Sequence, residues 1–248
     1  MAQVKAVVLA AGKGTRMQSE TMQMPKVLRQ ACGKPLLHYV LEALDFLPEK
    51  DIILVVGYRR EMVEAAFGAY PFCVQEPQLG TGHAVQCARE QLEGFSGTVL
   101  VCYGDMPLLR KEVYEALLQQ HRASGAVCTL LSGTCQEELP YGRVLCDAQG
   151  NFERVVEDRD CTSQQKAIRD LNVGIYAFEA EELLACLDLL KNNNAQKEYY
   201  LTDVPQIMKE RGGKVQVYRA QLDEQIIGVN TPEQLAQVEA FLRQSGRA

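Results

Sequence analysis

The feature that most restricts the fold is the alternation of short apolar segments with amphipathic segments through the first half of the chain. Apolar, β-branched runs predict strands, and apolar residues spaced three and four apart predict helices. Regular strand–helix alternation with short connections favours a mostly parallel sheet with helices on both faces. We therefore predict an α/β protein. The expected strands are residues 4–9, 51–56, 72–74 and 98–102, and the expected helices are residues 35–47, 60–67, 83–92 and 113–121.

The second half of the chain has a different pattern. Strand patterns follow one another closely at residues 127–131, 142–146, 152–156 and 172–178. They form either a mixed part of the same sheet or a small β extension that covers a pocket. Helices at 181–190, 202–210 and 232–242 and a strand at 215–218 complete the pattern, and Thr231 is the expected N-cap of the last helix. Because no linker or repeat interrupts the pattern, one domain over residues 1–248 is the simplest arrangement.

A glycine-rich, basic turn follows the first strand, in the sequence LAAGKGTRM at residues 9–17. Gly12 and Gly14 allow positive φ angles and a close approach of backbone N–H groups to a ligand. A concave row of N–H donors favours an anion, and Lys13, Arg16 and the later Lys26 add positive charge. A surface turn with solvated charges is the alternative. The turn lacks the third glycine of the dinucleotide motif and the GK[ST] of a P-loop.

Three unusual segments follow three of the predicted parallel strands. They are the glycine turn, residues 75–83 and the Tyr-Gly-Asp turn at 103–105. Ligands of such sheets bind beyond the carboxyl ends of the strands, so we expect the three segments to converge. Asp105 suits Mg²⁺, which is held by one or two carboxylates with phosphate oxygens, or else it bonds its own backbone in a turn. His83 is either a general base or a structural residue at the start of a helix.

Composition excludes several classes of protein. A formal net charge of −6 and a pI near 5.3 argue against nucleic-acid binding, which usually needs a basic surface. The nine cysteines have no metal-ligand spacing and resemble the buried, reduced thiols of a cytoplasmic protein. No apolar run approaches the ~18 residues of a membrane span, and no signal peptide is evident. We therefore expect a cytoplasmic protein with neither nucleic acid nor membrane as a partner.

A family resemblance covers nearly the whole chain, from Val4 to about Asn230. The segments LAAGKGTRM, PKVL, GKPLLHYV, QLGTGHA, YGD, YGR, NNNAQKEYYLTD and GVN occur in order. In this respect the chain resembles the N-acetylglucosamine-1-phosphate uridyltransferase domain of the bifunctional bacterial enzymes, within the sugar nucleotidyltransferase superfamily. The resemblance implies a Rossmann-like, three-layer α/β/α fold. It also implies transfer of uridylate from UTP to a sugar 1-phosphate with release of pyrophosphate.

The resemblance assigns expected roles to individual residues. It implies a nucleotide-binding half over about residues 1–110 and a sugar-phosphate half over about 111–248. Arg16 and Lys26 match the catalytic cations, and Asp105 and Asn230 match the Mg²⁺ ligands. The nucleotide side is expected to comprise Leu9, Ala10, Ala11, Gly12, Gln75, Gln78, Gly80 and Thr81, with Tyr103 and Gly104 also contacting substrate. The sugar-phosphate side is expected to comprise Gly142, Glu157, Asn172, Tyr200 and Thr202.

The chain also departs from the family pattern. Val173, Lys197 and Thr231 stand where the family usually has threonine, glycine and asparagine. These departures are expected near the sugar side or the metal ligands, so they concern the identity of the sugar more than the transfer reaction. The hexapeptide repeats of the acetyltransferase domain do not occur in the sequence, so we expect a monomer or weak oligomer rather than the β-helix trimer. A sister enzyme for another sugar phosphate or nucleotide and a non-catalytic nucleotide-binding protein are the alternatives.

Overall fold

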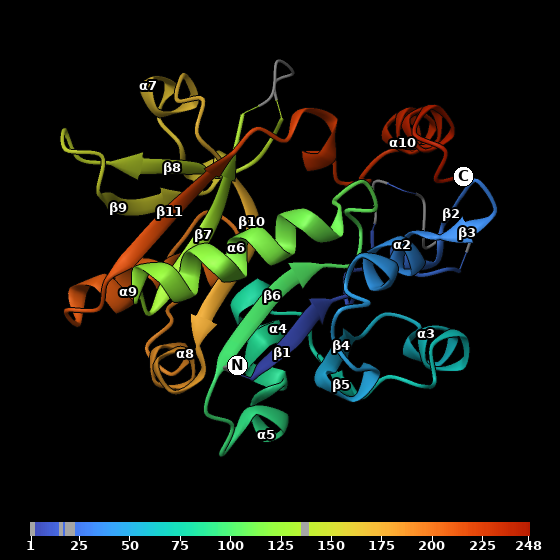
Figure 1. Cartoon of the computed structure of the whole chain (residues 1–248), viewed down its shortest axis with the longest axis horizontal. Coiled ribbons are helices and arrows are strands. Elements are labelled where there is room, and N and C mark those ends of the chain that lie inside the picture. Colours follow the sequence, from blue (N-terminus) through green and yellow to red (C-terminus); the bar gives the residue numbers. More distant parts are fainter. Residues whose placement is uncertain (1–2, 15–16, 18–22, 135–138) are drawn as a thin grey trace.

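A nine-stranded sheet forms the framework of the computed structural model, which describes residues 3–14, 17, 23–134 and 139–248 (Figure 1). Seven strands form one continuous path, and β8 (Arg143–Cys146) and β9 (Phe152–Val156) attach beside β10. The strands along the path are β11 (Val215–Ala220), β7 (Cys128–Gly133), β10 (Leu171–Glu179), β6 (Thr98–Tyr103), β1 (Val4–Leu9), β4 (Ile52–Val56) and β5 (Phe72–Val74).

Strand direction confirms the predicted mixed, mostly parallel sheet. β6, β1, β4 and β5 run parallel, and β11 runs parallel to β7. β10 is antiparallel to both of its neighbours, β6 and β7. The strands of the second half therefore continue the main sheet, and only β8 and β9 form a small antiparallel extension.

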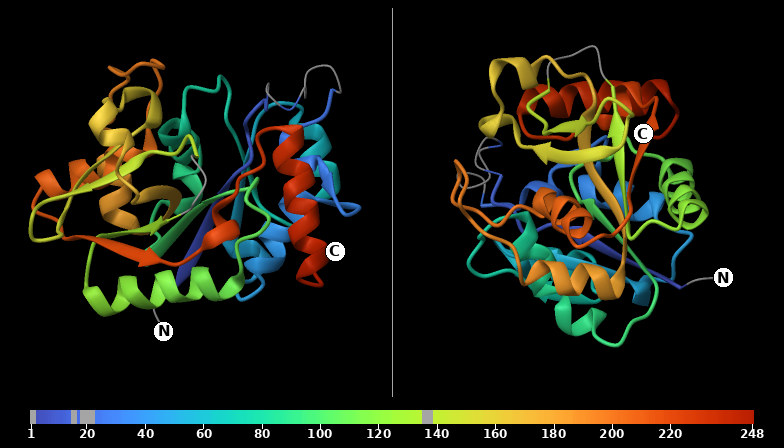
Figure 2. Two further views of the ribbon diagram at one scale, coloured as in Figure 1. Left: turned by 90° about the horizontal axis from the view of Figure 1, so that it is seen from above. Right: turned by 90° about the vertical axis from the view of Figure 1, so that its left-hand side faces the viewer.

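Helices cover both faces of the sheet, which confirms the three-layer, Rossmann-like arrangement (Figure 2). One face packs against α2 (Leu36–Ala43), α3 (Arg60–Ala66) and α6 (Lys111–Ser124). The other face packs against α4 (Thr81–Cys87), α5 (Arg89–Leu92), α8 (Ala180–Leu187) and α9 (Val204–Glu210). Along β1, Ala6 and Val8 join the first core and Val7 and Leu9 join the second. An apolar run on both faces is what a central parallel strand requires.

The predicted helix over residues 83–92 is wrong in detail, because the chain forms two short helices divided at Ala88. Several very short elements were not predicted. They are too short to display a periodicity of hydrophobic residues. These elements are β2 (Gln30–Ala31), β3 (Lys34–Pro35), α7 (Ser163–Lys166) and the 3₁₀ helices η2 (Lys26–Leu28), η3 (Glu49–Asp51), η4 (Asp158–Asp160), η5 (Leu201–Asp203) and η6 (Asp223–Ile226).

Helix α10 (Pro232–Gln244) closes the fold against β2 and α2. Thr231 is its N-cap as predicted, because the Thr231 hydroxyl accepts a hydrogen bond from Gln234 N and the Gln234 side chain accepts one from Thr231 N. This reciprocal capping box satisfies two backbone donors that would otherwise lack partners. The cap also fixes the chain direction at Asn230, immediately before the helix.

Eight cysteines lie in the described part of the chain, and all are free thiols. Cys102, Cys128 and Cys186 are buried as predicted, whereas the other five are partly exposed, so the prediction of buried thiols is wrong for them. They lie on short strands, helix ends and loops, where packing from neighbouring elements is incomplete. Across the described residues, no helix is both long and apolar enough to span a bilayer.

Candidate active site

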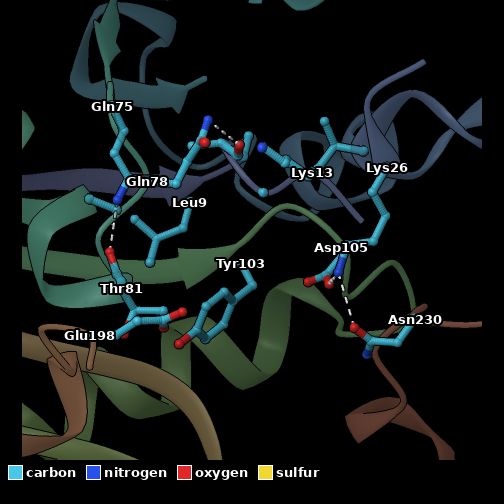
Figure 3. Close-up of a pocket in the computed structure, with 16 residues that line it drawn as sticks. Leu9, Lys13, Lys26, Gln75, Gln78, Thr81, Tyr103, Asp105, Glu198 and Asn230 are labelled. Carbon is cyan, nitrogen blue, oxygen red and sulfur yellow. Dashed lines mark hydrogen bonds and ion pairs between the residues drawn. The ribbon is translucent and has the colours of Figure 1, made fainter. Parts of the chain in front are cut away.

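A cavity of about 410 Å³ opens at the carboxyl ends of the parallel strands (Figure 3). The ends of β1, β5 and β6 all contribute to it, so the three segments singled out in the sequence do converge. Predicted site residues that line the cavity are Leu9, Ala10, Ala11, Gly12, Lys26, Gln75, Gln78, Gly80, Thr81, Tyr103, Asp105 and Asn230. Of the rest, Gly104 is buried and is not among the lining residues, and its N–H donates to Leu9 O at 3.0 Å.

The glycine turn extends β1 into the cavity wall. Ala10 N donates to Val55 O at 2.9 Å, and Tyr58 N donates to Ala11 O at 3.2 Å, so this backbone is anchored to the end of β4. Gly14 has a φ of +65°, as predicted. Gly12 does not have a positive φ, so that part of the prediction is wrong; a Cβ built at Gly12 meets open space. Thr15 and Arg16 lie outside the described residues.

Lys26, Asp105 and Asn230 meet at one side of the cavity (Figure 3). Lys26 Nζ donates to Asp105 Oδ2 in an ion pair and to Asn230 Oδ1 at 3.1 Å. The side chains of Lys26 and Asp105 are each 15% exposed. Lys26 is held in place because the next two residues of its 3₁₀ turn, Val27 and Leu28, are buried in the core. A carboxylate oxygen and an amide oxygen therefore point at one shared cation.

Tertiary structure places Asn230 beside Asp105, although the two residues are far apart in the sequence. Val229 N donates to Asp105 O at 2.9 Å, which pairs the two backbones directly. Asn230 N then donates to Gln234 Oε1 at 2.8 Å within the cap of α10. The backbone of Asn230 is fixed from both sides, so its side-chain amide is presented to the Lys26 and Asp105 pair.

The Asp105 and Asn230 oxygens are suitable donors for a magnesium ion. Mg²⁺ prefers hard oxygen ligands and is commonly held by one or two protein groups together with substrate phosphates and water. The two oxygens already converge on the Lys26 ammonium, so their geometry accommodates a positive charge between them. In the described part of the chain, no group of three or more His, Cys, Asp or Glu side chains forms a metal cage. The donor set fits a metal bound jointly by protein and substrate.

The segment after β5 forms the opposite side of the cavity. Gln75 is only 4% exposed, and its Nε2 donates to Gly80 O at 2.8 Å. Gln78 Nε2 reaches Ala11 O at 3.5 Å, which links this segment to the glycine turn. Figure 3 shows Gln75, Gln78 and Thr81 on one side, Lys26 and Asn230 on the other, and Tyr103 between them.

Residues 79–82 pair closely with residues 199–201. Tyr199 N donates to Leu79 O and Gly82 N to Tyr199 O, both at 2.8 Å, and Leu201 N donates to Thr81 Oγ1 at 3.0 Å. Gly80 has a φ of +112°, and a Cβ there would lie 2.6 Å from Tyr199 O. Only glycine permits both this backbone conformation and this approach. The QLGTGHA and EYYLTD motifs therefore form one structural unit.

The residues expected on the sugar-phosphate side lie together next to this unit, outside the set that lines the cavity. Asn172 N donates to Gly142 O at 2.8 Å, and the Asn172 amide pairs with the Tyr176 hydroxyl. Thr202 Oγ1 donates to Glu157 Oε1 at 3.0 Å. Burial raises the pKa of Glu157, and the Thr202 hydrogen bond opposes this shift. The structure thus gathers these residues beside the cavity, although none of them is among the residues that line it.

Tyr103 connects the two groups. Burial raises the pKa of its hydroxyl, and the nearby negative charges of Glu157 and Asp105 raise it further. Gly174 leaves room for the ring, because a Cβ there would lie 2.2 Å from Tyr103 Cε2. The partly buried Tyr103 therefore belongs to the cavity wall and also lies near the Glu157 group.

The chain is similar to a family whose domain is described as the MobA-like NTP transferase domain. The family model matches residues 6–168, about two thirds of the chain, and includes the glycine turn, residues 75–83 and Asp105. The chain belongs to this NTP transferase family.

Individual relatives extend the similarity beyond the domain match. A protein named bifunctional protein GlmU from Clostridium novyi (strain NT) is 43% identical over 240 residues, which are 96% of this chain and 52% of that protein. The protein of the same name from Geobacillus sp. (strain WCH70) is 42% identical over 240 residues, again 96% of this chain and 52% of that protein. This NTP transferase chain therefore spans about half the length of the curated relatives it matches.

Several features of the NTP transferase site were missed by sequence reasoning. Lys13 was noted only as mobile charge, yet it lines the cavity with Val27, Ala84 and Glu198. Glu198 could have been found from its place within the EYYLTD motif. Val27 and Ala84 resemble ordinary core residues and carry no signal. Lys197 adopts a φ of +57°, which explains why glycine suits this position.

Proposed function

We propose that this NTP transferase joins UTP to N-acetylglucosamine 1-phosphate and forms UDP-N-acetylglucosamine and pyrophosphate. The observation that carries the proposal is the convergence of Lys26, Asp105 and Asn230 opposite Gln75, Gln78 and Thr81 in one cavity. This arrangement has charge for phosphates at one end and amide groups for a nucleobase at the other. The relatives named bifunctional protein GlmU support the same assignment.

The reaction we propose needs no nucleophilic side chain. A phosphate oxygen of the sugar 1-phosphate bonds to the α-phosphorus of UTP, and the bond from that phosphorus to the bridging oxygen of pyrophosphate breaks. Because the attacking oxygen is already charged, the protein's task is to hold two anions in line and offset their repulsion. Lys26 and Arg16 are the proposed catalytic cations, with the backbone of Leu9 to Gly12 positioning the phosphates.

Asp105 and Asn230 are the proposed Mg²⁺ ligands. The metal, when bound, would supply positive charge to the phosphate oxygens of both substrates. Lys26 already occupies the point between these two oxygens, so we expect its ammonium to move toward the phosphates when the nucleotide and metal enter. The side chain has room for this movement because it borders the cavity.

We propose one domain with two functional halves. The half over residues 1–110 supplies the nucleotide contacts, including Gln75, Gln78, Gly80, Thr81, Tyr103 and Gly104. The half over 111–248 supplies the sugar-phosphate contacts, including Gly142, Glu157, Asn172, Tyr200 and Thr202. Tyr103 links the two halves, because its side chain lines the cavity and the nearby charge of Glu157 raises its pKa. A monomeric or weakly oligomeric state and a cytoplasmic location remain predictions.

A substrate screen tests the proposal directly. The purified protein is incubated with Mg²⁺, one nucleotide and one sugar 1-phosphate from a panel. The nucleotides are the four ribonucleoside triphosphates and dTTP, and the release of pyrophosphate is measured for each pair. We expect the fastest release with UTP and N-acetylglucosamine 1-phosphate, and no release without a divalent cation. A faster reaction with another pair would assign a sister enzyme. UTP binding without product from any sugar phosphate would assign a nucleotide-binding protein instead.

A further inference from the structure

The amide of Gln75 is held so that its donor and acceptor ends face different surroundings. Its Nε2 lies 2.8 Å from Gly80 O and 3.3 Å from His83 Nδ1. An amide nitrogen carries two hydrogens, so it can donate to both neighbours when His83 Nδ1 carries no proton. Among the described residues, none donates a hydrogen bond to Gln75 Oε1. The residue lines the cavity, so the carbonyl oxygen is the end of the amide left for a ligand.

The two neighbours of Nε2 fix the direction of the amide. Gly80 O is a carbonyl and only accepts, so a flipped amide would place two acceptor oxygens together. His83 Nδ1 favours the same direction only when it is an unprotonated acceptor. Burial lowers the pKa of His83, which favours the neutral ring. The proton then resides on Nε2, which faces Cys87 Sγ at 3.9 Å.

We propose that His83 is a positioning residue that orients the Gln75 amide and thereby sets the preference of the cavity for the nucleobase. This inference rests on the proposed function only in assuming that the nucleobase lies against Gln75. An amide that presents only its oxygen accepts a hydrogen bond from the ring N3–H of uracil. It repels the unprotonated N3 of cytosine, which is itself an acceptor.

The size of the effect follows from the loss of one hydrogen bond. A neutral hydrogen bond contributes about fivefold to an equilibrium. Without an acceptor at residue 83, only Gly80 O holds the amide. The equilibrium between the two orientations of the amide then shifts toward the flipped one by the same factor. The flipped amide presents Nε2 to the cavity and suits cytosine. The preference for UTP over CTP should therefore decrease about fivefold.

The test compares His83→Phe with His83→Asn. Phenylalanine keeps a planar ring but removes the acceptor, whereas asparagine can place its side-chain oxygen where Nδ1 lies. His38→Phe, the same change on an exposed residue of α2, is the matched control. Dissociation constants for UTP and CTP are measured by calorimetry, and KM and kcat are measured where product forms. Thermal unfolding checks that each variant folds.

We expect His83→Phe to reduce the ratio of CTP to UTP dissociation constants about fivefold and to raise the KM for UTP with kcat nearly unchanged. His83→Asn should restore most of the ratio, and His38→Phe should leave it unchanged. An unaltered ratio in a folded His83→Phe variant would overturn the inference, as would a wild-type protein that binds both nucleotides equally. Since binding is measured without a sugar phosphate, failure of the proposed transfer reaction is a separate result.

Discussion

Replacing Lys26 with methionine should slow nucleotidyl transfer by about 10²–10³-fold, the usual cost of removing one preorganised charge from an active site. Lys26 Nζ is the cation on which the oxygens of Asp105 and Asn230 converge, and its side chain is 15% exposed. Methionine keeps most of the length of the aliphatic side chain and removes the charged ammonium group. The loss should therefore fall on kcat with both substrates saturating.

The same substitution should have a smaller effect on folding. Exposed ion pairs contribute about 0.2–1 kcal/mol and breaking a buried pair costs about 3–5 kcal/mol. The pair of Lys26 and Asp105 lies between these limits because each side chain is 15% exposed, so we expect a loss of about 1–2 kcal/mol. In a chain of this size that loss lowers Tm by about 5 °C.

The assay measures pyrophosphate release and thermal unfolding for Lys26→Met and for Lys111→Met. Lys111 forms a comparable ion pair with Asp45 at 2.6 Å, but these side chains are 39% and 61% exposed and lie outside the residues lining the cavity. The control should retain wild-type turnover. If Lys26→Met retained a kcat close to that of wild type, the assignment of a catalytic charge to Lys26 would be wrong.

Three further substitutions test the structure around the site. Gly174→Ala should destabilise the protein by about 2–4 kcal/mol, because its φ is +81° and the new Cβ would meet Tyr103; urea unfolding measures this loss, and an unchanged midpoint would contradict it. Asp203 has a pKa raised to about 6 by burial and by Asp160, so the folded state binds more protons than the unfolded state between about pH 4 and 6, and its stability falls as pH rises through that window. Asp203→Asn should reduce this dependence of stability on pH and raise the free energy of unfolding by about 1 kcal/mol at pH 8, after allowance for solvent screening. Tm measured against pH follows both effects, and a pH dependence equal to that of wild type would refute the role of Asp203. Lys197→Gly should raise stability by about 0.5–1 kcal/mol because it relieves a left-handed backbone at φ +57°, and a lower Tm would show that the lysine side chain makes a stabilising contact.

Much of the fold could be predicted from local patterns. The strand over residues 4–9 has the predicted bounds, because both faces of a central parallel strand must be apolar. The half-buried edge strand over residues 72–74 also has the predicted bounds. The cap at Thr231 could be predicted because its partner lies only three residues away. The division of residues 81–92 into two helices could not, because the apolar spacing on either side of Ala88 fits a single helix equally well.

By itself, the sequence determined the α/β alternation, the glycine turn at the end of the first strand and the family motifs. These features depend on side-chain periodicity and on backbone freedom at single residues, which are local properties. Tertiary structure decided the rest: that Val229 pairs with Asp105, that residues 79–82 pair with 199–201, and that Gln75 is fixed by Gly80 and His83. These contacts join segments that the packing of helices on a mixed sheet brings to one edge. Local sequence patterns do not predict such contacts between distant segments. The chemistry of the site depends on such contacts, because a charge or an amide acts only where the fold holds it.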